Sequence, residues 1–295
     1  MEARKSLTDM LDRYFEALTK RDSGKLPLAS NFKFTENGQK LDARWALWAT
    51  ASGTPYPRYA DFLDPARGQA ATFSVIDENG TPIVMSLRIK VEDGKITESE
   101  HVVCRHHDLL FHPEGMDHPA TQFTKVDPAR RSTRDAASKI FNLYFDGVEQ
   151  DNGDIIPVTR DCIRMENGLQ TVLADDFSLS ARRRGGLNLG KLGIAGQINT
   201  GYFKYIDRIR DRRIPIYDEE QSIVFGFVFM EHPGNVKSVK VKGMPGVDVV
   251  ELAPFTQRPS SGYIAEAFQI EDGKIRTVAA ILDFFPFGMK SGWEN

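Results

Sequence analysis

Cysteine is scarce in this sequence. Only Cys104 and Cys162 occur among 295 residues, and they lie far apart with no C-x-x-C spacing. A disulfide framework is therefore excluded, and the pair is typical of free thiols in a reducing compartment. Long apolar runs are missing too, since no window approaches the ~18 uncharged apolar residues of a membrane span and the N-terminus does not have the pattern of a signal peptide. We expect a cytoplasmic protein without a membrane partner.

An excess of charge of one sign is also missing. The chain carries 38 Lys and Arg against 41 Asp and Glu, which leaves no positive field for binding nucleic acid. The nucleotide-binding patterns G-x-G-x-x-G and G-x-x-x-x-G-K-[ST] are absent, and so is the G-x-S-x-G turn of serine hydrolases. We therefore expect no nucleic-acid partner and no cofactor.

What the sequence does contain is an internal repeat, seen as four short matches in the same order. The offset grows along the chain, which predicts a modest insertion in the second copy and a larger one at about residues 232–262. The matches are Tyr14-Phe15 with Tyr144-Phe145 and Glu36-Asn37-Gly38 with Glu166-Asn167-Gly168, both at an offset of 130, Ile83-Val84 with Ile223-Val224 at 140, and Glu92-Asp93-Gly94-Lys95-Ile96 with residues 271–275 at 179.

Each copy has the same predicted order of elements. An amphipathic helix (7–20 and 136–149) precedes a short strand, a mixed helical stretch (43–63 and 191–206) and long antiparallel strands joined by Asp-Gly turns. This predicts an α+β fold with two helix-capped curved sheets. The expected domains are a first domain at 1–103, a His-rich linker or lid at 104–134, a second domain at 135–285 and a tail at 286–295.

This order of elements, with EDGKI before the last strand of each copy and Asp283 beyond the second, resembles the nuclear transport factor two superfamily. The resemblance covers nearly the whole chain and implies two tandem cone-shaped α+β barrels, of cystatin-like type and related to polyketide-cyclase-like proteins. That superfamily includes isomerases, dehydratases, lyases, cyclases and binding proteins, so it implies a fold rather than a function. A further similarity to cofactor-independent lyases that release formaldehyde from lignin-derived diarylpropanes has no residue-level motif behind it.

Five of the six histidines lie within eighteen positions. Their spacing fits no zinc pattern, so we expect no bound metal, but three interpretations stay open: a solvated polar connection, acid–base catalysis or metal binding. The five are His101, His106, His107, His112 and His118.

A second polar group lies where a helix is expected to meet a strand, at Tyr205, Asp207 and Arg208. Asp–Arg pairs often only tie such junctions together, although an arginine held by an aspartate also orients anionic or phenolic ligands. Strand alternation places Glu266 beside Ile264 and Phe268, opposite Tyr263. If that face is the interior, desolvation raises the pKa of Glu266 and suits it to acid–base chemistry; if it faces out, Glu266 is solvated.

Aromatic residues are numerous where the mouths of the two cones are expected. Such residues most often belong to a core, but their number also suits a pocket for an aromatic ligand. The candidate substrate-binding residues are Trp45, Trp48, Tyr59, Arg208, Phe227 and Phe229.

We therefore predict a cofactor-independent lyase, dehydratase or isomerase acting on a small hydrophobic or aromatic substrate. The lyase form is the cleavage of a diarylpropane diol with release of formaldehyde. Bond breaking without a cofactor needs a proton donor and a proton acceptor, and the candidates are His106, His107, Tyr205, Asp207 and Glu266. The alternative is a non-catalytic binding or assembly protein of the same fold, and association of the chain into a homo-oligomer stays open.

Overall fold

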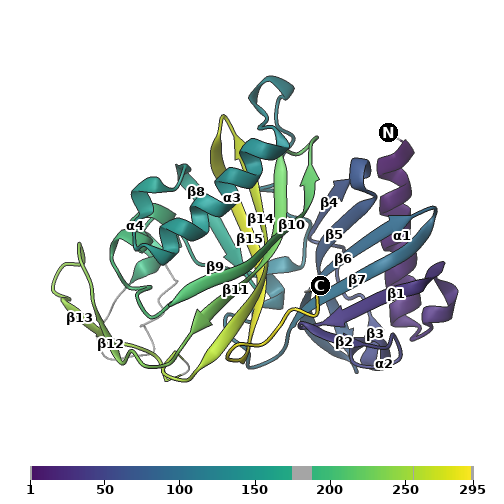
Figure 1. The fold of residues 1–295 in the computed structure, drawn as a ribbon, viewed down its shortest axis with the longest axis horizontal. Helices are drawn as coiled ribbons and strands as arrows, with labels where there is room; N and C mark the ends of the chain where they lie inside the picture. Colours follow the sequence, from purple (N-terminus) through teal and green to yellow (C-terminus); the bar gives the residue numbers. More distant parts are fainter. Residues whose placement is uncertain (1, 175–187, 255, 294–295) are drawn as a thin grey trace.

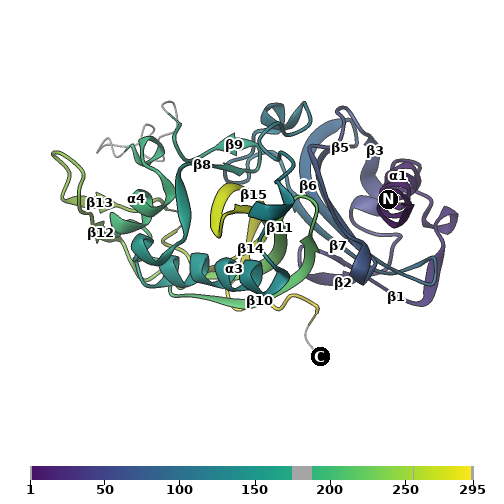
Figure 2. The same cartoon turned by 90° about the horizontal axis from the view of Figure 1, so that it is seen from above.

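The computed structural model describes residues 2–174, 188–254 and 256–293. Two curved sheets pack against each other in the middle of the molecule, and a long helix covers the outer face of each (Figures 1 and 2). The chain is thus an α+β tandem of two units, each a curved sheet backed by a helix, as the sequence predicts. Among the described strands neither sheet closes into a barrel.

The two sheets have matching strand orders. The first is β2-β1-β7-β6-β5-β3, with β4 also paired to β5. Read in the same direction, the second is β9-β8-β15-β14-β11-β10. The helices are α1 (Glu2–Thr19), α2 (Leu47–Thr50), α3 (Arg134–Glu149) and α4 (Ile194–Asn199). The strands are β1 (Leu28–Glu36), β2 (Gln39–Leu41), β3 (Ala51–Gly53), β4 (Ala60–Asp64), β5 (Gln69–Glu78), β6 (Thr81–Glu92), β7 (Lys95–Cys104), β8 (Val158–Glu166), β9 (Leu169–Gln170), β10 (Arg208–Asp218), β11 (Ile223–His232), β12 (Ser238–Lys240), β13 (Val249–Glu251), β14 (Ser260–Glu271) and β15 (Lys274–Pro286).

Several details differ from the expectation. The stretch 43–63 contains only the short helix α2, together with β3, most of β4 and irregular segments, and the insertion at 232–262 contains the hairpin β12–β13. Each sheet also contains one parallel pair, β1 with β7 and β8 with β15. The part of the chain described here has no helix long and apolar enough to cross a membrane.

The sheet order corrects one of the four repeat matches. Strand β6, which contains Ile83, occupies the place of β14 and not that of β11, which contains Ile223. Strands β4 and β5 correspond to β10 and β11 instead, so that Asp64 matches Asp218 at an offset of 154. The second unit therefore has two insertions of similar length, one between β9 and β10 and one between β11 and β14.

The faces of the two sheets that meet are strongly apolar. Phe225, Phe227 and Phe229 of β11 point into this layer, where Phe62 of the first unit stacks on Phe225 at 5.6 Å between ring centroids. Tyr59 is buried in the same layer. Aromatic residues expected to form a ligand pocket thus join the two units, because the apolar face of β11 that contains them is the one turned toward the other sheet.

Two reciprocal ion pairs flank this layer. Arg4 of α1 donates to Asp218 of the second unit at 2.8 and 2.9 Å, and Arg134 of α3 donates to Asp64 of the first unit at 2.7 and 3.0 Å. Each aspartate also accepts a backbone N–H across the interface, from Leu63 and Tyr217 respectively. The contact is therefore isologous, like that between the subunits of a twofold symmetric dimer.

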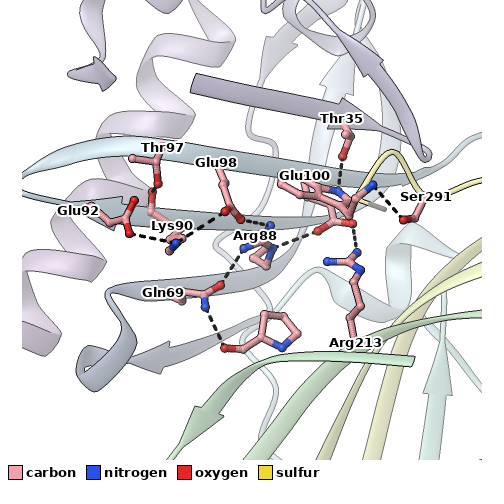
Figure 3. A network of polar contacts seen from close by, with 12 residues as sticks. Thr35, Gln69, Arg88, Lys90, Glu92, Thr97, Glu98, Glu100, Arg213 and Ser291 are labelled. Atoms are coloured by element: carbon pink, nitrogen blue, oxygen red, sulfur yellow. Dashed lines mark hydrogen bonds and ion pairs between the residues drawn. The ribbon is translucent and has the colours of Figure 1, made fainter. Parts of the chain in front are cut away.

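A buried polar network lies at the edge of the same interface (Figure 3). Arg88, which is 2% exposed, binds Glu98 at 2.7 Å and Glu100 at 3.0 Å. Glu100 in turn accepts from Arg213 of the second unit at 2.5 Å, and the ring of Trp293 lies 4.8 Å from the Arg88 guanidinium. Charged groups here are paired across the interface, which avoids the cost of burying them alone.

Candidate functional site

A cavity of about 100 Å³ lies inside the second unit, between its sheet and the helices α3 and α4. Its wall is mostly apolar, with a few polar groups that converge on it. The lining residues are Leu109, Leu110, Tyr144, Val148, Arg164, Glu166, Leu189, Gln197, Ile198, Tyr202, Phe203, Tyr205, Ile206, Met230, His232, Ile264, Glu266, Leu282 and Phe284.

Strand alternation places two carboxyl groups in one row of the cavity wall. Glu266 of β14 lies opposite Ala280 of β15, and Ala280 lies opposite Glu166 of β8. At ~4.8 Å between neighbouring strands, the two glutamate backbones are about 10 Å apart. Gly226 is the neighbour of Glu266 on its other side, where the Phe141 ring packs so closely that a Cβ on Gly226 would lie 2.5 Å from it.

The Glu266 carboxyl group is held in an apolar environment. It is 4% exposed and has no hydrogen-bond partner among the described residues. Burial raises its pKa to about 8, with a smaller contribution from the charge of Glu166 and an opposing one from Arg164. Glu266 therefore carries a proton at neutral pH and can donate it.

Arg164 binds Glu166 and the polar side chains around it, at the other end of the row. Its Nε donates to Glu166 Oε2 and to Thr171 Oγ1 at 3.0 Å, its Nη1 donates to the Tyr144 hydroxyl at 3.1 Å, and its Nη2 donates to Gln197 Oε1 at 2.9 Å. Only one oxygen of Glu166 is used in these contacts, and the other has no partner within the described residues. The ion pair thus holds an ionised carboxylate at the cavity wall.

Two tyrosines complete the polar wall. The Tyr144 hydroxyl accepts from Arg164, which leaves its own proton without an acceptor in the described part of the chain. Burial raises the pKa of both Tyr144 and Tyr205, so both remain proton donors. With Glu266, the cavity offers three groups that can donate a hydrogen bond to a ligand oxygen.

The first unit shows why the second has an open cavity. At the position of Ala280 the first unit has His101, which is fully buried, binds the Tyr14 hydroxyl at 2.9 Å and lies 3.6 Å from Glu36. At the positions of Arg164 and Glu266 it has Phe34 and Leu87, both buried. At these three positions the first unit has a histidine and two large apolar side chains, whereas the second unit has an alanine and two polar residues.

The linker between the units covers the cavity. Leu109 and Leu110 form part of its wall, and the Asn167 amide donates to the Leu109 carbonyl at 2.8 Å while His112 N donates to the Asn167 carbonyl at 3.0 Å. Gly168 permits this close approach, because a Cβ there would lie 2.0 Å from the His112 carbonyl oxygen.

The structure separates the residues that the sequence analysis selected. Tyr205 and Glu266 line the cavity. His106 and His107 are exposed, with His107 in a surface groove beside Asp108 and Asp283. The remaining candidates lie outside the cavity wall: Asp207, Arg208 and Trp45 are exposed, Trp48 belongs to the core of the first unit, and Tyr59, Phe227 and Phe229 lie between the sheets.

The sequence analysis did not select these polar residues of the wall: Tyr144, Arg164, Glu166, Gln197 and His232. Tyr144 and Glu166 were noticed only as marks of the repeat. Comparing the two copies position by position could have identified Arg164, because the first copy has Phe34 at the same place. A charged residue in one copy and an apolar residue in the other mark a position where the two copies differ in chemistry. Among the described residues no group of three or more His, Cys, Asp or Glu side chains is placed to hold a metal ion.

Comparison with solved structures finds proteins that match a third to a half of this chain. An NTF2-like protein of unknown function from Cytophaga hutchinsonii is 17% identical over 33% of this chain and 88% of its own, with a TM-score of 0.28. A provisionally named polyketide cyclase from Sinorhizobium meliloti is 18% identical over 32% and 93%, with a TM-score of 0.26. A provisionally named isomerase from Bacillus subtilis is 10% identical over 50% and 87%, with a TM-score of 0.31.

No curated protein matches the chain. The model of a family described as "Domain of unknown function (DUF8021)" matches residues 1–103 and 130–282, most of the chain, and the protein therefore belongs to the DUF8021 family.

Proposed function

We propose that the cavity of the second unit is the active site of a cofactor-independent enzyme that moves a proton on a small, mostly apolar ligand. The observation that supports this most directly is the pair Glu266 and Glu166, two carboxyl groups in one row, of which Glu266 has a raised pKa and Glu166 is ion-paired with Arg164. A site with a protonated and an ionised carboxyl group has both the donor and the acceptor that acid–base catalysis needs.

The proposed roles follow from the contacts. The free oxygen of Glu166 removes a proton from the carbon next to a ligand carbonyl group. Glu266 and the Tyr144 hydroxyl donate hydrogen bonds to the oxygen on which negative charge develops. In an isomerisation the proton returns to another carbon, whereas in an elimination Glu266 protonates the leaving hydroxyl group, which departs as water. Each acid–base group typically contributes ~10²–10⁴-fold to the rate.

The size of the cavity restricts the ligand. A volume of about 100 Å³ is of the order of the ~150 Å³ cavity that accommodates a benzene molecule in an engineered protein. A single ring suits it, whereas the diarylpropane diol expected from the resemblance has two aromatic rings. We therefore propose a single-ring carbonyl compound as the substrate class.

Two probes with a common product test this function. Isomerisation of cyclohex-3-enone and dehydration of 3-hydroxycyclohexanone both form cyclohex-2-enone, which is followed by its ultraviolet absorbance. We expect the parent protein to convert one of them, and Glu266→Ala and Glu166→Gln to lower kcat at least 100-fold. Glu251→Gln, at an exposed position of β13, is the matched control.

Binding of cyclohexanone without conversion of either probe would favour the non-catalytic alternative. Equal rates in the parent and in both cavity variants would show that the two glutamates do not carry the chemistry.

A further inference from the structure

His232 is a buried histidine whose ring makes no hydrogen bond to any described residue. It ends β11, is 1% exposed and lines the cavity. Neither Nδ1 nor Nε2 has a partner within residues 2–174, 188–254 and 256–293, and burial lowers the pKa of the imidazole to about 4. The ring is therefore neutral at physiological pH, with one N–H donor and one acceptor nitrogen that are both unused. Leaving such groups unpaired is costly in a folded protein.

The neighbours of His232 are aromatic. The ring of Tyr205 lies 5.1 Å away at 76°, and the ring of Phe284 lies 5.1 Å away at 36°. The Tyr205 hydroxyl also has no partner within the described residues. A turn of the imidazole about its χ2 bond exchanges ring nitrogens and carbons, so either kind of atom can be presented to the cavity that the ring lines.

The first unit provides an internal comparison for these positions. Glu78 occupies the place of His232, and Arg105 occupies the place of Phe284. There the two side chains form an ion pair at 2.7 Å, and Glu78 also accepts from Thr50 at 2.8 Å. In the first unit the polar side chains at these two positions therefore bind each other. In the second unit His232 has no hydrogen-bond partner among the described residues.

We propose that His232 is a ligand-binding residue that hydrogen-bonds a second oxygen function at the far end of the ligand. His232 lies opposite Ser260, six residues along β14 from Glu266, so the two residues act on different ends of the ligand. The proposal rests on the proposed function for the Glu266 end and adds the substrate class: a neutral single-ring carbonyl compound that also carries a hydroxyl or second carbonyl group.

The charges of the site favour a neutral ligand. Arg164 and Glu166 compensate each other in an ion pair at 3.0 Å, while Glu266 is protonated and His232 is neutral. Among the described residues that line the cavity no charge is unpaired, so an anionic or cationic ligand would lose its hydration there without gaining an opposite charge.

Binding of two probes tests the proposal. Titration calorimetry compares cyclohexanone with 4-hydroxycyclohexanone in the parent protein, in His232→Phe and in His118→Phe, whose side chain is exposed. We expect the hydroxylated probe to bind the parent and His118→Phe roughly ten-fold more tightly than cyclohexanone, the size of one hydrogen bond. In His232→Phe that preference should disappear while cyclohexanone binding persists. The proposal is overturned if the parent binds neither probe or binds both equally well. It is also overturned if His232→Phe still prefers 4-hydroxycyclohexanone.

The ligand-free protein supplies a second readout. Replacing an unpaired buried polar ring with an apolar ring of similar shape is neutral or stabilising, so His232→Phe should not lower the Tm. A Tm several degrees lower would mean that the imidazole has a structural partner, such as a permanently held water, and would also overturn the proposal.

The two proposals fail in different experiments. Loss of the hydroxyl preference in His232→Phe, together with full activity of the Glu266 and Glu166 variants, would reject the catalytic roles and leave the ligand class in place. An unchanged hydroxyl preference in His232→Phe, together with loss of activity in the Glu266 and Glu166 variants, would reject only the role of His232.

Discussion

Glu266 is the residue at which stability and chemistry conflict most clearly. A carboxyl group in an apolar strand keeps its proton in the folded protein up to a pH of about 8 but releases it in the unfolded chain near pH 4.5. Between these values the folded state holds one more proton than the unfolded state, so the contribution of Glu266 to stability falls as the pH rises. It is fully present below the unfolded pKa and is lost as the pH passes through the folded pKa.

Glu266→Gln should reveal this dependence. The amide cannot ionise, so we expect the variant and the parent to differ little near pH 4.5 and the variant to become more stable by a few kcal/mol near pH 8, at ~1.4 kcal/mol per pH unit. Urea denaturation at pH 5, 6, 7 and 8 measures the difference, with Glu251→Gln as the exposed control. A difference that is constant across this range would contradict the raised pKa.

Ala280 lies between Glu266 and Glu166 on the sheet, in the interior of the second unit. Its counterpart His101 fills the first unit and is bonded to Tyr14, which corresponds to Tyr144. We expect Ala280→His to abolish binding of cyclohexanone, because the imidazole would occupy the space between Glu266 and Glu166, at a cost in stability of about 1–3 kcal/mol from overpacking. Calorimetry measures the binding, and Ala66→His, at an exposed position, is the control. Unchanged binding would place the ligand elsewhere.

At the scale of elements, the sequence predicted the parts that depend on local patterns. The helices α1 and α3 follow from apolar residues at helical spacing, and the EDGKI hairpins follow from Asp-Gly turns, where Asp93 and Asp272 adopt φ of 50°. The Ile-Val match failed because two β-branched residues suit any buried strand and so carry little positional information.

The site was harder to predict because β11 is apolar on both faces. Phe225, Phe227 and Phe229 alternate with Val224 and Val228, and both sets are fully buried. When both faces are apolar, alternation separates the two faces but does not identify which one points into the cavity. The same reasoning left Glu266 undecided until the packing of the two sheets was known.

The linker over the cavity is an element whose docking can be tested at Gly168. Gly168 and Gly80 have similar backbone angles, φ of 88° and 82°, but a Cβ at Gly80 meets nothing within 4 Å whereas one at Gly168 meets the His112 carbonyl oxygen. We expect Gly168→Ala to lower the free energy of unfolding by about 2 kcal/mol more than Gly80→Ala, and to speed proteolysis within residues 105–131. Equal losses would mean that the linker does not dock tightly on the second unit.

At the scale of the whole molecule, we expect the two units to unfold as one cooperative structure. Their apolar sheet faces cover each other, and the buried aspartates of each unit are bonded by the other unit through an arginine and a backbone N–H. The unit with the filled interior therefore supports the unit with the cavity, which tolerates unpaired polar groups that reduce its own stability.

The reciprocal ion pairs make this coupling measurable. Asp218 is fully buried and Asp64 is 1% exposed, so replacing either with alanine removes the carboxylate that accepts from a buried N–H and from a part-buried arginine. We expect Asp218→Ala and Asp64→Ala each to lower the free energy of unfolding by roughly 2–4 kcal/mol. Because the contact is symmetric, amide hydrogen exchange should speed up in β6 of the first unit and in β14 of the second alike, whichever aspartate is changed.

Asp9→Ala, which removes an exposed pair with Lys5, is the control. It should change the free energy of unfolding by less than about 0.5 kcal/mol and leave hydrogen exchange in both strands nearly unchanged. Faster exchange confined to the unit that carries the substitution would mean that the two units unfold independently, and that the filled unit does not stabilise the one that holds the cavity.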